Sequence, residues 1–170
     1  MRSGIWIPYA MALCVALGGA SGMMLQSARG SSTEDEVPKV TGVGGFFFKA
    51  QNPGKLADWY RDHLGIALEA AGKGENAPRY CSFQWSERNH PEQHGSTSWS
   101  IFPADTKYFG PGNSQFMVDF RVTNLDRLLT QLRKDGVKVE DKTEEASYGR
   151  FAWATDAEGN RIELWEPKGE

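Results

Sequence analysis

The sequence predicts an α+β fold in which two βαβββ modules form one cup-shaped, incompletely closed barrel. Three observations lead to this prediction. Each half of the chain has the layout strand, polar turn, amphipathic helix, glycine, second strand. Matching residues recur at one constant spacing, Phe48 with Phe120 and Asn52 with Asn124. The last strands of each half also recur. The matched pieces are 44–69 with 117–140, 83–85 with 151–153, and 98–103 with 161–167.

The N-terminal segment is expected to lie outside this fold. Residues 5–25 carry no charge, Arg2 precedes them, and small residues follow their most apolar part. That order is typical of a secretory signal peptide, and the run is also long enough for an uncleaved anchor. We therefore expect residues 1–26 to be a signal peptide or membrane anchor and the polar residues 27–39 to be a linker. The domain at 40–167 is then expected outside the cytoplasm, exported, periplasmic or membrane-anchored.

In the first module, about 40–105, a helix is expected between the first two strands. Asn52 and Pro53 are expected to open it, since proline is tolerated in the first turn of a helix. Gly65 is expected to end it as a left-handed cap. An apolar stripe at helical spacing indicates the buried face of this helix. The stripe consists of Leu56, Trp59, Tyr60, His63 and Leu64.

The second module, about 114–167, repeats this organisation. Its helix carries a leucine stripe and is expected to end at Gly136. In the strands expected at 116–122 and 161–167, side chains alternate between two faces. One face packs beneath the helix, and the other must meet solvent, a ligand or the first module. That second face carries Met117, Asp119, Arg121, Arg161, Glu163 and Trp165.

The duplicated βαβββ layout, the helix end WYRDHLGI and the closing segment DAEGNRIELWEP resemble the vicinal oxygen chelate superfamily. This superfamily includes glyoxalases, bleomycin-resistance proteins and extradiol dioxygenases. The resemblance covers nearly all of residues 40–167 and implies a cup that holds a small molecule. Because this fold hosts isomerisation, ring cleavage, thiol transfer and drug sequestration, the resemblance leaves the activity open.

The resemblance also implies a divalent metal in the cup, held by residues of the first and last strand of a module. Carried over to this chain, one last-strand ligand is Glu163. The two first-strand positions are occupied by Gly45 and Met117, and the remaining position by Ser100 or Trp99, depending on the alignment. A single carboxylate does not make a catalytic metal centre. We therefore expect no metal cofactor, and keep a divalent metal as the less favoured alternative.

Glu163 is the candidate catalytic residue, and three interpretations of it stay open. It is a general base, a remaining metal ligand, or a carboxylate in an ordinary cross-strand ion pair. For the ion pair, the candidate partners are Arg121, Arg150 and Lys49.

Lys49 and Arg121 occupy matching places in the two modules, and alternation puts both on the inner face. Together they could hold an anionic ligand, because a guanidinium offers two parallel donors to a carboxylate. Ordinary strand-end charge is the alternative. The other expected ligand contacts are Asp119, Tyr148, Arg150 and Trp153, of which the aromatic residues could equally belong to the core.

Composition narrows the function. The net charge of −3 shows no excess of basic residues, so we expect no nucleic-acid partner, and two cysteines are too few for a cysteine-based zinc site. The first hypothesis is a glyoxalase-like protein outside the cytoplasm that binds a small polar or anionic molecule without metal. The alternatives are an active lyase or isomerase that uses Glu163, and a scaffold without a ligand. Membrane contact is expected only through the N-terminal segment, and a homodimer is left open.

Overall fold

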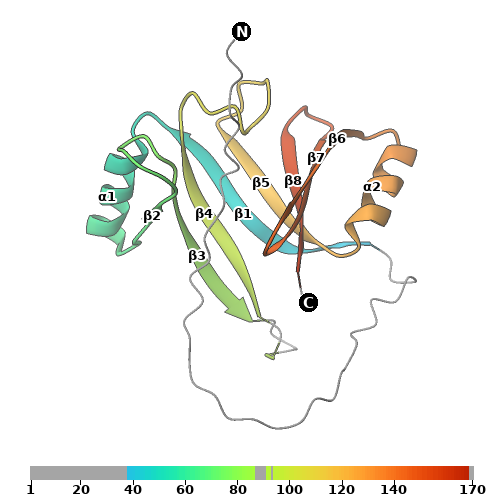
Figure 1. The fold of residues 1–170 in the computed structure, drawn as a ribbon, viewed down its shortest axis with the longest axis horizontal. Coiled ribbons are helices and arrows are strands. Elements are labelled where there is room, and N and C mark those ends of the chain that lie inside the picture. Colours follow the sequence, from blue (N-terminus) through green and yellow to red (C-terminus); the bar gives the residue numbers. More distant parts are fainter. Residues whose placement is uncertain (1–37, 87–90, 93, 169–170) are drawn as a thin grey trace.

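The computed structural model describes residues 38–86, 91–92 and 94–168, so the expected signal peptide or anchor lies outside the described residues. The described chain folds into two modules with the predicted βαβββ order, which confirms that prediction (Figure 1). The first comprises β1 (Val40–Ala50), α1 (Pro53–Leu64), β2 (Glu69–Ala70), β3 (Arg79–Ser86) and β4 (His94–Pro103). The second comprises β5 (Phe116–Val122), α2 (Leu125–Lys134), β6 (Lys138–Ala146), β7 (Gly149–Thr155) and β8 (Arg161–Pro167).

All eight strands belong to one mixed sheet in the order β2-β3-β4-β1-β5-β8-β7-β6. Within each module the first and last strands pair in parallel, β1 with β4 and β5 with β8. The two modules meet where β1 and β5 pair antiparallel. Figure 1 shows α1 and α2 at the two outer sides of the sheet, which is not closed into a barrel. The α+β fold is thus confirmed, and we call the face turned away from both helices the inner face.

Helix α1 begins and ends as predicted, but only part of its predicted apolar face is buried. The Asn52 side chain accepts a hydrogen bond from the Lys55 N–H at 2.9 Å, and Gly65 is left-handed with φ 69°. The expected apolar stripe is only partly correct, because Trp59 is 48% and Leu64 58% exposed. Bulky rings beneath the helix meet only part of the stripe, and close packing is confined to the first turn and Ala57.

Helix α2 covers a conventional apolar core. It ends at Lys134 with Asp135 as the cap, one residue before the predicted stop at Gly136, which is left-handed at φ 78°. Leu125 and Leu129 of α2 form this buried core with residues of the sheet beneath the helix, which are Val122, Ala152, Ala154 and Leu164. These residues fix the outer face of β5, β7 and β8, so alternation turns the residues between them to the inner face. Neither described helix is long and apolar enough to cross a membrane.

Candidate functional site

Two acidic side chains lie side by side at the centre of the inner face. Asp119 on β5 is the direct neighbour of Glu163 on β8, and the two residues are only 3% and 2% exposed. The row continues to Gly45 on β1 and to Trp153 on β7. Because paired strands are about 4.8 Å apart, residues in one row share a face and lie close together. The fold therefore buries two carboxyl groups next to each other, where β5 and β8 pair.

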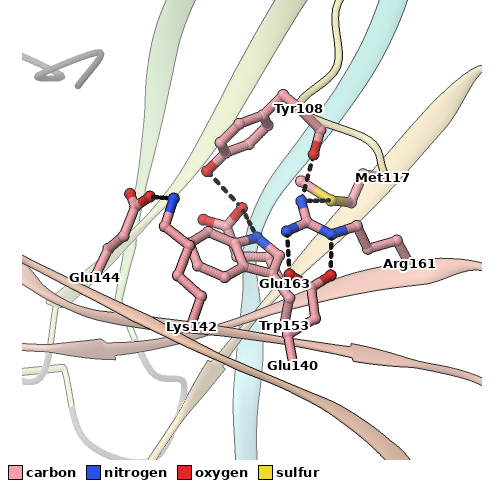
Figure 2. A network of polar contacts seen from close by, with 8 residues as sticks. All are labelled: Tyr108, Met117, Glu140, Lys142, Glu144, Trp153, Arg161 and Glu163. Carbon is pink, nitrogen blue, oxygen red and sulfur yellow. Dashed lines mark hydrogen bonds and ion pairs between the residues drawn. The ribbon is translucent and has the colours of Figure 1, made fainter. Parts of the chain in front are cut away.

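The Glu163 carboxyl accepts two hydrogen bonds at the same oxygen. Tyr108 Oη donates to Glu163 Oε2 at 2.8 Å, and Trp153 Nε1 donates to it at 3.1 Å (Figure 2). Trp153 itself is buried at 1% exposure. Tyr108 comes from the segment 104–115, which connects the two modules, so one hydrogen bond ties this connection to the last strand.

Asp119 occupies a space that only glycines leave open. A Cβ atom at Gly44 would lie 2.5 Å from Asp119 Oδ2, and one at Gly45 would lie 3.4 Å from Asp119 Cβ. Here β1 has a register irregularity opposite β5, between Val43 and Gly45. The other carboxyl oxygen, Asp119 Oδ1, is buried and has no hydrogen-bond partner among the described residues. A buried carboxyl oxygen of this kind takes either a proton or a partner from outside the chain, such as a water, an ion or a ligand.

Burial shifts the proton equilibria of this pair. Burial raises the pKa of Glu163 to about 7, although the hydrogen bonds from Tyr108 and Trp153 act in the opposite direction. The pKa of Asp119 is raised well above its usual range, first by burial and then by the adjacent Glu163. Two like charges so close together cannot both form easily, so the pair retains a proton near neutral pH. Burial and Glu163 also raise the pKa of Tyr108, which remains a neutral hydroxyl donor.

Arg161 on β8 holds the surroundings of the pair in place. Its guanidinium donates to both carboxylate oxygens of Glu140, at 2.6 and 2.8 Å, and to the carbonyl oxygen of Tyr108 (Figure 2). It also lies 4.7 Å from the centre of a Trp153 ring. The hydrogen bonds from Arg161 lower the pKa of Glu140. Arg161 therefore donates its hydrogen bonds to Glu140 and to the connecting segment. Its positive charge still lowers the pKa of Glu163 and so favours the ionised form of that residue.

The ion-pair partners proposed for Glu163 from sequence are wrong, because its partners are Tyr108 and Trp153. Arg150 lies two residues from the core residue Ala152 on β7 and so faces α2. There it pairs with Asp126 on α2, so it does not join the inner face. Alternation along β8 predicts the face that Glu163 occupies. It does not predict its hydrogen-bond partner Tyr108, which lies in the connecting segment.

Lys49 and Arg121 are not brought together either. Arg121 on β5 pairs with Gly42, near the start of β1. Lys49 lies near the end of β1, where its N–H donates to the carbonyl oxygen of Gln115. The separation of about six residues along β5 corresponds to roughly 20 Å. Two cations so far apart cannot hold the same small group. The carboxyl pair lies between them, because Asp119 pairs with a residue in the middle of β1.

The remaining expected contacts have structural partners. Arg121 donates to Thr41 Oγ1 at 2.7 Å and lies 5.8 Å from the Trp85 ring. The Lys49 Nζ lies 5.3 Å from the Phe109 ring. Tyr148, between β6 and β7, packs edge-on against the Phe151 ring at 5.6 Å.

Tyr108 is the site residue that sequence reasoning missed. It lies in a connection without periodicity, and its partner Glu163 is far away in the chain. The available signal was the aromatic pair Tyr108–Phe109 in an otherwise polar segment rich in Gly and Pro. In the structure this pair packs against Phe102 of the first module and Trp153 of the second.

The residues present do not fit the divalent metal that the fold family implies. Among the described residues, no three His, Cys, Asp or Glu side chains come together to hold a metal ion. Met117 and Ser100 are buried, but neither offers the charged oxygen ligand that a hard cation prefers. Two donors already point at the Glu163 oxygen Oε2, and a cation there would face both hydrogens. We therefore derive no chemical step through a metal.

Two paired βαβββ modules in one eight-stranded sheet are the architecture of the vicinal oxygen chelate superfamily. The family model described as "Glyoxalase-like domain" matches residues 45–165, and the chain belongs to this family. Its fold is thereby related to those of glyoxalases and epimerases.

The individual relatives share little sequence identity with this chain. The uncharacterised protein YraH of Bacillus subtilis strain 168 is 27% identical over 115 residues, covering 66% of this chain and 88% of YraH. A single-residue variant of Streptomyces coelicolor methylmalonyl-CoA epimerase, in complex with 2-nitronate-propionyl-CoA, gives a TM-score of 0.57 at 15% identity, covering 77% of this chain and 100% of that one. The Mycobacterium tuberculosis epimerase gives 0.51 at 21% identity, covering 76% and 90%. At these identities the structures establish the fold alone.

Proposed function

We propose that this domain binds a small polar molecule at the Asp119–Glu163 pair on the inner face, without a metal ion. The observation that carries the proposal is the buried acceptor Asp119 Oδ1 without a hydrogen-bond partner among the described residues. Leaving such a group unpaired costs about 1–3 kcal/mol, which a ligand donor would recover. Placing it beside a second buried carboxyl adds to the cost, and strongly perturbed acids of this kind cluster at functional sites.

The chemistry of the pair favours a ligand that donates hydrogen bonds. A hydroxyl or amino group can donate to Asp119 Oδ1 when the proton of the pair lies on another oxygen, whereas a carboxylate would face the remaining negative charge at close range. The sequence predicts a polar or an anionic ligand, and of these two classes we favour a polar molecule that carries hydrogen-bond donors. Arg121 lies against Thr41 and Trp85, and Lys49 lies over the Phe109 ring, so the contacts of these cations are away from the pair.

A binding screen with a matched pair of variants tests this proposal. Small hydroxylated and aminated compounds are titrated into the protein, and binding is measured by thermal shift and calorimetry. We expect a binder whose affinity falls about tenfold or more in Asp119→Asn, because an amide presents a donor in place of one acceptor. The control Asp141→Asn alters an exposed aspartate of β6 and should keep full affinity. Equal affinity in the two variants, or no binder at all, would contradict the proposal.

Proton transfer by Glu163 is a second candidate function, favoured by its pKa of about 7. A base with such a pKa is well matched to neutral pH. In the reaction we propose, Glu163 removes a proton from a carbon of the bound molecule, exchanges it with solvent in part of the turnovers, and delivers a proton to another atom of the same molecule. The net result is an isomerisation. In D2O the wild type should exchange deuterium into the ligand and Glu163→Gln should not; exchange that survives in Glu163→Gln would refute the role.

We further propose that the domain works outside the cytoplasm, because residues 5–25 are uncharged and follow Arg2. Fractionation of the source cell should find the chain exported or with the membrane. A variant that lacks residues 1–26 should stay in the cytoplasm. Full-length chain in the cytoplasmic fraction would refute this part of the proposal.

A further inference from the structure

The Tyr108 side chain occupies a slot built for a flat ring. Its ring stacks on Phe102 at 5.3 Å with an interplanar angle of 4°, and meets Trp153 edge-on at 6.3 Å. Phe47 closes the slot at 6.4 Å. At the far end, the hydroxyl donates to Glu163 Oε2 at 2.8 Å. The slot thus offers ring contacts along its sides and one carboxyl acceptor at its end.

This ring belongs to a connecting segment whose next residue, Phe109, is buried at 2% exposure in a cluster with Phe47 and Trp153. Within the segment 104–115, Thr106 N–H bonds the Pro103 carbonyl at 3.0 Å and Gly110 N–H bonds the Lys107 carbonyl at 3.1 Å. These bonds are local and can persist if the Tyr108 side chain leaves the slot while Phe109 stays in place. Its ties to the second module include the Tyr108 hydroxyl and the donation from Arg161 to the Tyr108 carbonyl (Figure 2).

We propose that Tyr108 occupies the position of the ligand, and that the site takes an aromatic hydroxyl whose phenol ring replaces the Tyr108 side chain. This inference rests on the proposed function and adds the ligand class to it. A phenol reproduces the ring contacts with Phe102 and Trp153 and the donation to Glu163. Asp119, the direct neighbour of Glu163 on the paired strand, offers a further acceptor to a ligand with a second hydroxyl. An aliphatic polyol would leave the ring faces unused.

Displacement of Tyr108 can be measured on the wild-type protein. Lys107 is exposed, so trypsin can cleave before Tyr108 once the Tyr108 side chain leaves the slot and the backbone there loosens. We expect saturating 4-methylphenol to increase the peptide that starts at Tyr108 several-fold, as quantified by mass spectrometry. Toluene, which has the same shape without the hydroxyl, should leave cleavage unchanged. No increase with 4-methylphenol, or an equal increase with toluene, would overturn the inference.

Two variants test the slot directly. Tyr108→Ala should empty it and bind 4-methylphenol about tenfold more tightly than toluene, the factor expected for one hydrogen bond to a carboxyl. Tyr108→Phe keeps the slot filled and should bind neither compound, which controls for binding elsewhere. If Tyr108→Ala does not fold, the wild-type cleavage assay still decides the inference. Asp119-dependent binding of an aliphatic polyol but not of 4-methylphenol would overturn the phenol class while leaving the proposed function intact.

Discussion

The stability of the folded protein should decrease as the pH rises from about 5 to 8, because Glu163 ionises less readily in the folded state. The Glu163 carboxyl has a pKa of about 7 when folded, against 4.5 for an ordinary glutamate. Over this window the folded state retains a proton that the unfolded chain has lost. One pKa unit corresponds to about 1.4 kcal/mol, so the loss amounts to about 3 kcal/mol and is complete above pH 7. Asp119 contributes with the same sign, since its pKa is also raised.

Glu163→Gln should remove most of this pH dependence. The amide oxygen can still accept from Tyr108 and Trp153, but the residue no longer ionises. At pH 8 the variant should be more stable than the wild type by about 2–3 kcal/mol, and at pH 5 the two should agree within about 1 kcal/mol. The free energy of unfolding is measured by urea denaturation at pH 5, 6, 7 and 8.

An exposed glutamate provides the control for this experiment. Glu158→Gln removes one carboxyl from the turn between β7 and β8 and should retain the wild-type pH dependence. The reasoning would be refuted if wild-type stability were flat or increased between pH 5 and 8. It would also be refuted if Glu163→Gln kept the wild-type slope.

Three further predictions address the backbone, the hydrogen bonds and the metal. Gly149→Ala should destabilise the fold by about 3 kcal/mol or more in urea denaturation, because the new Cβ would lie 2.5 Å from the Glu166 carbonyl oxygen at φ 155°. Gly159→Ala, whose Cβ would meet no atom within 4 Å, should cost only about 1 kcal/mol. Trp153→Phe should lose about 1–3 kcal/mol in the same assay, since the indole N–H donates to Glu163. Dialysis against EDTA should leave the melting temperature unchanged, and a tightly held metal equivalent would contradict this.

Much of the fold could be predicted because its signals are local. The Asn52 cap, the glycines after each helix and the alternation around Asp119 are all set by neighbours within a few residues. The exposed Trp59 shows the limit of this approach. Helical spacing identified an apolar stripe, but which part of it is buried depends on the size of the rings beneath the helix.

The site was predictable only in part, because its contacts join distant parts of the chain. Alternation put Asp119 and Glu163 on the inner face, but only the β5–β8 pairing makes them direct neighbours. The hydroxyl of Tyr108 comes from a segment without a periodic pattern, so no sequence rule paired it with Glu163. The repeat suggested that Lys49 and Arg121 cooperate, whereas antiparallel pairing at the module junction separates equivalent residues.

Carbon-13 NMR of the side-chain carboxyls tests most directly whether the Asp119–Glu163 pair is the binding centre. The two resonances are assigned by their loss in Asp119→Asn and Glu163→Gln. During titration with a compound that stabilises the protein, we predict that both resonances shift in step with saturation, while those of exposed Asp141 and Glu158 stay in place. A compound that saturates the protein and leaves both Asp119 and Glu163 unshifted would contradict the account.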